Sequence, residues 1–285
     1  MKALKTLFII VQYLLPQHLI SRLVGHLAEA RIFWLKNLLI ERFISHYGVN
    51  MSEAEEEDPR VYRSFNEFFT RALKPDARSI CSGEKEIACP ADGAISQLGK
   101  IEEGRIFQAK GHDYSLYTLL GGNNEDALPF KNGRFATVYL SPKDYHRVHM
   151  PMDGKLIATH YIPGQLFSVN QTTAENVDRL FARNERLVCL FETAAGPMAV
   201  ILVGAMIVAG IETVWAGQIA PPPKTVQSRR FDQQQTVELK KGDELGRFKL
   251  GSTVVLLFGD EVVEWLPGFD AGTQTRMGEA LATLS

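Results

Sequence analysis

Three residues that lie far apart in the chain have the side chains needed to cleave an amide bond. Asp92 belongs to an Asp-Gly pair, His149 closes the segment YHRVH at residues 145–149, and Ser252 follows a glycine. An aspartate can orient a histidine, the histidine can take a proton from a serine, and the serine oxygen can then attack a carbonyl carbon. The carbonyl nearest to Ser252 is that of Gly251, where the lack of a side chain permits close approach.

The same residues also have ordinary structural interpretations. An Asp-Gly pair commonly forms a turn, and a serine hydroxyl is a weak nucleophile unless a base takes its proton. Gly251 and Ser252 precede the apolar run 254–258, so they could equally form a β-bulge or the start of a strand. His146 and His149 could be two surface histidines or part of a zinc site, but no further ligand lies at a compact spacing and we expect no metal.

The composition restricts the class of protein. The chain has 285 residues, of which 45% are hydrophobic and 22% charged, as is usual for a globular protein. A formal net charge of -2 argues against a dedicated nucleic-acid-binding protein, because such proteins are usually basic. The cysteines form no C-x-x-C pair, so they indicate neither a disulfide framework nor a zinc knuckle and fit a reducing compartment.

Residues 1–48 have the pattern of amphipathic helices. Leucine and isoleucine recur at helical spacing, Pro16 separates the first helix from the second, and no apolar run reaches about 18 residues. The stretch is basic and rich in aromatic residues, namely Phe8, Tyr13, Phe33, Trp34 and Phe43. We favour helices that lie in a membrane interface with anionic lipid. A helical hairpin packed on the protein core would also be amphipathic, and this alternative stays open.

An acidic run at residues 53–58 separates these helices from the rest of the chain. We therefore expect an N-terminal membrane-associating helical region at residues 1–60 and a β-rich catalytic domain at residues 61–285. Ser64, with Glu67 three residues later, predicts a capping box at the start of a short helix.

From about Ser79 onward, glycines and prolines separate short runs of apolar and β-branched residues. We expect strands at residues 135–140, 187–192, 198–207 and 254–258. Two Pro-x-Asp-Gly sequences, at residues 90–93 and 151–154, predict turns that lead into strands, as in the hairpins of biotinyl and lipoyl carriers. The expected fold class is α+β, with N-terminal amphipathic helices followed by a β-sandwich or partly open barrel.

Several segments resemble the bacterial phosphatidylserine decarboxylases, which are made as proenzymes. They are SFNEFFTRAL at 64–73, PADG at 90–93, YHRVHMP at 145–151, IETVWA at 211–216 and LGST at 250–253. The LGST sequence is short and unspecific alone, whereas HRVHMP and PADG in the family's order are distinctive. The resemblance covers nearly the whole chain, and no catalytic position departs from the family pattern.

The resemblance implies an enzyme that makes its own pyruvoyl cofactor, covalently, from Ser252. Asp92 would orient His149, His149 would deprotonate Ser252, and the hydroxyl would cut the Gly251–Ser252 bond by autocatalytic serinolysis. A β chain would end at Gly251, and an α chain would begin with the pyruvoyl group. His146 would take part in decarboxylation as the proton donor.

The implied reaction converts phosphatidylserine to phosphatidylethanolamine through a Schiff base between the pyruvoyl ketone and the serine amine. The N-terminal helices would hold the enzyme as a peripheral protein on the cytoplasmic side of the cell membrane. We expect a homodimer of the αβ unit, since dimers are the commonest homo-oligomers. Basic residues that could bind the substrate phosphate, and that the sequence does not rank, are Lys143, Arg147, Arg229 and Arg230.

Other functions are compatible with parts of the sequence. An unprocessed β-rich carrier or scaffolding domain would need no chemistry and would remain a single chain. A zinc hydrolase would use His146, His149 and an aspartate together with stoichiometric zinc. A pyruvoyl-dependent amino-acid decarboxylase would share the chemistry, but a soluble substrate would leave the N-terminal helices unexplained.

Overall fold

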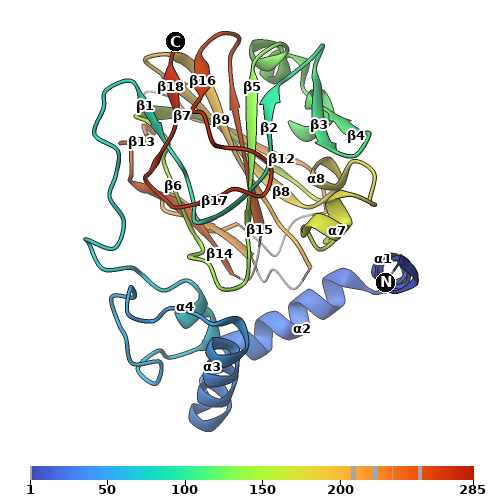
Figure 1. Ribbon diagram of the computed structural model, residues 1–285, viewed down its shortest axis with the longest axis vertical. Coiled ribbons are helices and arrows are strands. Elements are labelled where there is room, and N and C mark those ends of the chain that lie inside the picture. The colour runs from blue at the N-terminus through green and yellow to red at the C-terminus, as the bar shows by residue number, and fades with distance from the viewer. Residues whose placement is uncertain (1, 207–209, 220–223, 233, 250–251) are drawn as a thin grey trace.

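The structure, a computed structural model, describes residues 2–206, 210–219, 224–232, 234–249 and 252–285 (Figure 1). The helices are α1 (Lys2–Leu14), α2 (Gln17–Glu29), α3 (Phe33–Tyr47), α4 (Phe65–Phe69), α5 (Leu116–Leu119), α6 (Asn124–Ala127), η1 (Leu128–Phe130), α7 (Gln171–Ala174) and α8 (Leu180–Arg183). The strands are β1 (Glu86–Ala88), β2 (Gly93–Lys100), β3 (Arg105–Ala109), β4 (His112–Ser115), β5 (Arg134–Leu140), β6 (Arg147–His149), β7 (Gly154–Ile162), β8 (Arg186–Thr193), β9 (Gly196–Val203), β10 (Gly210–Thr213), β11 (Gly217–Gln218), β12 (Gln227–Arg230), β13 (Glu238–Leu239), β14 (Glu244–Lys249), β15 (Ser252–Phe258), β16 (Val263–Trp265), β17 (Gln274–Thr275) and β18 (Ala280–Leu284).

The helices predicted for residues 1–48 are confirmed as α1, α2 and α3, which lie on one side of the strands (Figure 1). Pro16 separates α1 from α2, and α3 ends at Gly48, whose φ of 66° is the left-handed conformation of a helix C-cap. Across the described ranges, no single helix is long and apolar enough to cross a membrane. Residues 5–14 and 17–29 meet that criterion only as a pair, bent by 89°.

The short helix α4 begins with the predicted cap. Ser64 Oγ accepts a hydrogen bond from Glu67 N at 3.2 Å, and the Glu67 carboxylate accepts one from Arg63 N. Apolar residues of α2, α3, α4 and their connections share one buried cluster, formed by Ala28, Ile40, Val49, Tyr62, Phe65, Phe68 and Phe69. The division of the chain at residues 60 and 61 stays a prediction, and the apolar core of the helices continues to Phe69.

A large antiparallel sheet forms the centre of the molecule, with strand order β12-β7-β8-β9-β15-β5-β2-β17 and with β13 beside β7. The predicted strands appear as β5, β8, β9 and β15, although residue 207, the predicted end of the third, lies outside the described residues. Strand β15 lies between β9 and β5 and is buried along its whole length. Burial on both faces explains why its sequence is a continuous apolar run and does not alternate.

The large sheet is the middle of three layers. On one face, Val254 and Leu256 pack in a cluster with residues of the smaller sheets β1-β18-β16 and β11-β10-β14-β6. On the other face, Val255 and Leu257 pack with the β3-β4 hairpin and the short helices α5 to α8.

The predicted α+β class is therefore confirmed. Within the part of the chain that is described, no barrel closes, because the large sheet ends at β12 and β17 and these strands do not pair with each other. The likeness of the hairpins to those of biotinyl and lipoyl carriers stays a prediction.

Candidate active site

Backbone hydrogen bonds bring three of the motifs together. Strand β6 pairs with β14, and His146 O accepts a hydrogen bond from Phe248 N at 3.0 Å. His149 N donates to Pro90 O at 2.8 Å. The PADG turn, the YHRVHMP segment and the strand that leads towards Ser252 are therefore neighbours, although they are distant in sequence.

Ser252 is the first residue of β15 and is fully buried. It pairs with Leu140 of β5, and no hydrogen-bond partner for its Oγ occurs among the described residues. Leaving a buried hydroxyl unpaired costs about 1–3 kcal/mol, so a serine is a poor choice for a position that only has to be filled. Gly251, its predicted partner in cleavage, lies outside the described residues.

His146 is fully buried, which excludes the surface position considered from the sequence, and its ring centroid lies 4.0 Å from that of Phe69. Nδ1 donates a hydrogen bond to Asp144 O at 2.8 Å, whereas Nε2 finds no partner in the described ranges. Burial, assisted by the charge of Arg71, lowers the pKa of His146 to about 3 although the bond to Asp144 opposes this. The imidazole is therefore neutral at physiological pH, with a free lone pair on Nε2.

Both ring nitrogens of His149 have partners. Nδ1 donates to Gly242 O at 2.8 Å, and Nε2 accepts the Tyr145 hydroxyl at 3.1 Å. Gly242 has a φ of 87°, which strains any larger residue, so a glycine holds this carbonyl in the turn before β14. Burial lowers the pKa of His149, and this imidazole is also neutral. To take a proton from another group, its Nε2 must release Tyr145.

The carboxylate of Asp92 is bound to Arg78 and not to His149. Arg78 Nε lies 2.9 Å from Asp92 Oδ1, Arg78 Nη2 contacts Oδ2, and Met277 N donates to Oδ1 at 2.8 Å. Arg78 Nη2 also lies 2.8 Å from a Glu53 carboxylate oxygen. Asp92 and His149 thus lie on neighbouring segments without the hydrogen bond that the triad requires. The role of Asp92 in orienting His149 stays a prediction.

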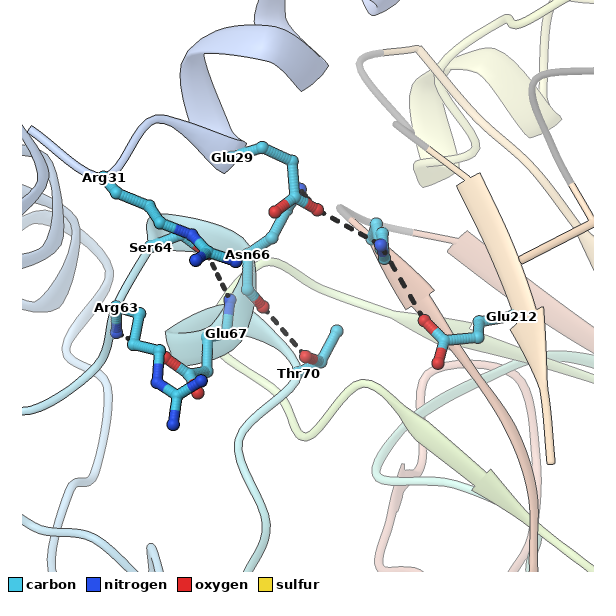
Figure 2. Close-up of a pocket in the computed structure, with 9 residues that line it drawn as sticks. Glu29, Arg31, Arg63, Ser64, Asn66, Glu67, Thr70 and Glu212 are labelled. Carbon is cyan, nitrogen blue, oxygen red and sulfur yellow. Dashed lines mark hydrogen bonds and ion pairs between the residues drawn. The ribbon is translucent and has the colours of Figure 1, made fainter. Parts of the chain in front are cut away.

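A polar cavity of about 220 Å³ lies between the helical region and the strands (Figure 2). The residues that line it are Glu29, Arg31, Arg63, Ser64, Asn66, Glu67, Thr70, Glu212 and Lys249. Lys249 Nζ lies 3.1 Å from Glu29 Oε1 and 3.8 Å from Glu212 Oε2, so it joins α2 to β10 across the cavity. Lys249 precedes Gly251, which lies outside the described residues, by two positions in the sequence.

Known proteins similar to this chain identify its family. The sequence model described as phosphatidylserine decarboxylase matches residues 65–283, and a second one, described as PSD, matches residues 7–48. A phosphatidylserine decarboxylase proenzyme of Ectopseudomonas mendocina (strain ymp) is 62% identical over 277 residues, which cover 96% of this chain and 97% of that protein. This chain belongs to the phosphatidylserine decarboxylase family. Proenzymes of the same name from Pseudomonas putida (strain W619) and Pseudomonas aeruginosa (strain LESB58) are 62% and 60% identical, each over 97% of this chain and over 97% and 96% of the relative.

Within this member of the phosphatidylserine decarboxylase family, sequence reasoning missed three residues of the site. The Tyr145 hydroxyl donates a hydrogen bond to His149 Nε2, and Arg78 binds the Asp92 carboxylate. The charge of Arg71 helps to lower the pKa of His146. Tyr145 and Arg71 lie inside YHRVHMP and SFNEFFTRAL, so the motifs themselves point to them. Arg78 belongs to no motif, and only the fold places it beside the PADG turn.

Metal-dependent catalysis and catalysis by a cysteine thiolate are two other chemistries that the described residues could be compared with. Within those residues, no group of three or more histidine, cysteine, aspartate or glutamate side chains is arranged to hold a metal ion. The thiols of Cys81, Cys89 and Cys189 are free. Burial raises the pKa of Cys89 to about 12, so its thiolate is scarce at neutral pH.

Proposed function

We propose that this chain decarboxylates phosphatidylserine to phosphatidylethanolamine with a pyruvoyl group made from its own Ser252. The observation that carries the proposal is the 62% identity to phosphatidylserine decarboxylase proenzymes over almost the whole chain. The buried hydroxyl of Ser252, which has no hydrogen-bond partner among the described residues, supports it, because an unpaired buried hydroxyl costs free energy. Pairing of β15 with β5 and β9 would hold the new terminus after cleavage.

The chain would process itself at the Gly251–Ser252 bond. His149 Nε2 would release Tyr145 and take the hydroxyl proton of Ser252, with support from Asp92. The Ser252 oxygen would bond to the Gly251 carbonyl carbon, the C–N bond would break, and the freed nitrogen would take the proton. Loss of the Ser252 α-proton would then expel the Gly251 carboxylate. Hydrolysis of the remaining dehydroalanine would release ammonia and leave the pyruvoyl group.

Two features fit such a group: Ser252 is fully buried, and His146 Nε2 has no hydrogen-bond partner among the described residues. Once formed, the group would supply an electron sink for the electron pair released when carbon dioxide leaves the substrate. His146 would carry a proton on Nε2 and give it to the carbon that has lost the carboxylate. Because the resting imidazole is neutral, with a pKa of about 3, it would first acquire that proton during the reaction.

The N-terminal helices would hold the enzyme as a peripheral protein on the cytoplasmic side of the cell membrane. Large apolar side chains on these helices are exposed, among them Leu14, Leu23, Phe33 and Trp34. Aromatic and aliphatic side chains on a helical surface insert into the boundary between headgroups and acyl chains. The lipid substrate could then present its headgroup while its acyl chains stay in the bilayer.

Hydrogen bonds to the connection between β7 and α7 hold α1 and α2 in place. Gln12 Oε1 accepts a hydrogen bond from Ser168 N at 2.8 Å, and Gln17 Oε1 accepts one from Leu166 N at 2.7 Å. Both glutamines are buried, whereas Leu14, Leu19 and Leu23 are exposed. We expect the mature enzyme to contain α and β chains from one precursor, assembled as a homodimer of the αβ unit.

Intact mass spectrometry tests this function directly. The purified chain should give two polypeptides, residues 1–251 and residues 252–285 with a pyruvoyl group in place of Ser252, and should release carbon dioxide from phosphatidylserine vesicles. Ser252→Ala should remain one chain without activity, while Ser52→Ala, at an exposed position, should behave as wild type. An active wild type that remains a single chain would contradict the pyruvoyl mechanism, and activity that requires stoichiometric zinc would favour a hydrolase.

A further inference from the structure

Arg71, two residues after α4, is a buried cation that has no anionic partner in contact among the described residues. Its exposed fraction is 4%, and its Nε has no hydrogen-bond partner in the described part of the chain. Within the described ranges, the guanidinium makes a long hydrogen bond from Nη2 to Lys143 O at 3.4 Å, and its Cζ lies 5.5 Å from the ring centroid of Phe68. The carboxylates of Asp92 and Glu53 act on it electrostatically, but both are engaged by Arg78.

Two other buried arginines show how this chain satisfies a guanidinium that only supports the fold. Arg186, exposed by 2%, donates to the carbonyl oxygens of Thr118, Leu119, Ala182 and Asn184 at 2.6 to 2.8 Å. Arg78 binds two carboxylates and a carbonyl. Arg71 has neither arrangement, and an arginine cannot lose its proton to escape the cost of burial. A partner supplied from outside the described residues would satisfy it.

The position of Arg71 is next to the candidate active site. Its charge is one of the causes that lower the pKa of His146, and the preceding residues contact the same segment. The Phe69 ring packs against His146 with its plane tilted by 41°, and Arg147 Nε donates to Thr70 O at 2.9 Å. Thr70 also lines the polar cavity, so the chain passes from the cavity wall directly to Arg71.

The basic residues considered from the sequence are less suited to bind an anion. Arg147 is paired with Glu244 at 2.9 Å, and Arg230 contacts Asp126 at 3.3 Å. Arg229 and Lys143 are exposed to solvent. Arg71 alone among these five is buried within the described structure without a carboxylate in contact.

We propose that Arg71 binds the phosphodiester of the phospholipid headgroup and so positions the substrate at the reacting centre. The proposal rests on the proposed function. The guanidinium fork matches two phosphate oxygens, and the phosphate lies a short carbon linker from the amine and carboxylate of the serine. The carboxylate is the less suitable partner, because it loses its charge in the reaction and an ion pair would stabilise the substrate more than the transition state. The phosphodiester keeps its charge throughout.

Kinetics of Arg71→Gln, Arg71→Lys and wild type test the proposal. Both variants should be cleaved normally, as judged by intact mass. Arg71→Gln should raise the KM for phosphatidylserine in mixed micelles by roughly tenfold to a hundredfold with a smaller change in kcat, since the contact is the same in ground and transition states. Arg71→Lys keeps the positive charge but loses the forked guanidinium, so its KM should lie between those of the wild type and Arg71→Gln. Arg105→Gln, at an exposed position on β3, is the matched control and should leave KM unchanged.

Binding of glycerophosphoethanolamine provides a second measurement, because this probe has the phosphodiester and the amine but no carboxylate. It should raise the Tm of the wild type and of Arg105→Gln but not that of Arg71→Gln. Unchanged KM and unchanged binding in Arg71→Gln would overturn the proposal. So would variants that all fail to fold or stay uncleaved, since Arg71 would then serve the fold or the processing step. The binding measurement needs no decarboxylation, so Arg71-dependent binding by a protein that releases no carbon dioxide would contradict the proposed function alone.

Discussion

The main-chain carbonyl of Asp144 fixes the tautomer of His146, because it accepts the Nδ1 proton at 2.8 Å and leaves the lone pair on Nε2. His149, three residues later, is also neutral, but its Nε2 already holds the Tyr145 hydroxyl. The two histidines therefore differ in one respect: Nε2 of His146 can accept a proton directly, whereas Nε2 of His149 must first release Tyr145.

We predict that variants separate the roles of these histidines. His146→Ala should still be cleaved but should lose about 10²- to 10⁴-fold in kcat, the usual contribution of a positioned acid or base. His149→Ala should remain a single chain. Intact mass and carbon dioxide release report the two outcomes separately. Tyr145→Phe is the control and should be cleaved, because it removes only the hydroxyl that is hydrogen-bonded to His149 Nε2. Equal loss of cleavage in both histidine variants would contradict the separate roles of His146 and His149.

Arg78→Met should destabilise the chain strongly, because it leaves Asp92 as a buried carboxylate without its cation. Breaking a buried ion pair on one side costs about 3–5 kcal/mol. Urea unfolding in a Ser252→Ala background measures the change without interference from cleavage. Lys131→Met is the comparison, since it breaks an exposed pair with Glu103 and should change the free energy of unfolding by about 0.5 kcal/mol or less. A similarly small effect for Arg78→Met would show that Asp92 does not depend on it.

Stability should fall as the pH decreases from about 6.5 towards 3, in part because of His146. Its pKa is 6.5 in a model peptide and about 3 in the fold, so between these values the unfolded chain binds the proton and the folded one does not. The slope from this group is at most about 1.4 kcal/mol per pH unit.

The measurement is the difference in unfolding free energy between Ser252→Ala and Ser252→Ala/His146→Asn across this pH window. His149 and His160 have pKa values lowered by burial and contribute in the same direction, whereas Asp144 and Glu185 have raised pKa values and act oppositely. These groups are common to both chains and largely cancel in the difference. A difference that does not vary with pH would mean that His146 is accessible to protons in the folded state.

Phe33→Ser/Trp34→Ser should weaken binding to anionic vesicles without changing cleavage. Both side chains are 67% exposed at the start of α3, so their replacement removes apolar surface that the fold does not bury. Vesicle flotation measures the effect. Leu128→Ser is the matched control, because Leu128 is 72% exposed but belongs to η1 and not to the N-terminal helices. Equal binding of all three proteins would assign the helices to packing.

The parts of the fold that could be predicted from sequence are those with a local physical cause. Pro16 ends a helix, Ser64 caps one, and the apolar run after Thr253 marks a strand buried on both faces. These signals depend on a few neighbouring residues. The α+β class follows from their order along the chain.

The contacts of the site could not be predicted in this way, because they depend on which segments the fold brings together. The sequence offers Asp92 as a partner of His149, but it does not show that the connection after α4 places Arg78 against the same carboxylate. The spacing of His146 and His149 likewise leaves open two surface histidines. Burial of His146 against Phe69 is a property of α4 packing on the segment before β6.

The segment 252–285 supplies β15 to the middle of the large sheet, β17 to its end, and β16 and β18 to the three-stranded sheet. The proposed cut would make this segment a separate polypeptide woven through two sheets, with neither piece retaining a complete core. Refolding of the mature protein would then be a bimolecular reaction, whereas the precursor folds as one molecule. The mature native state would therefore form readily from the uncut precursor but not from its two separated polypeptides.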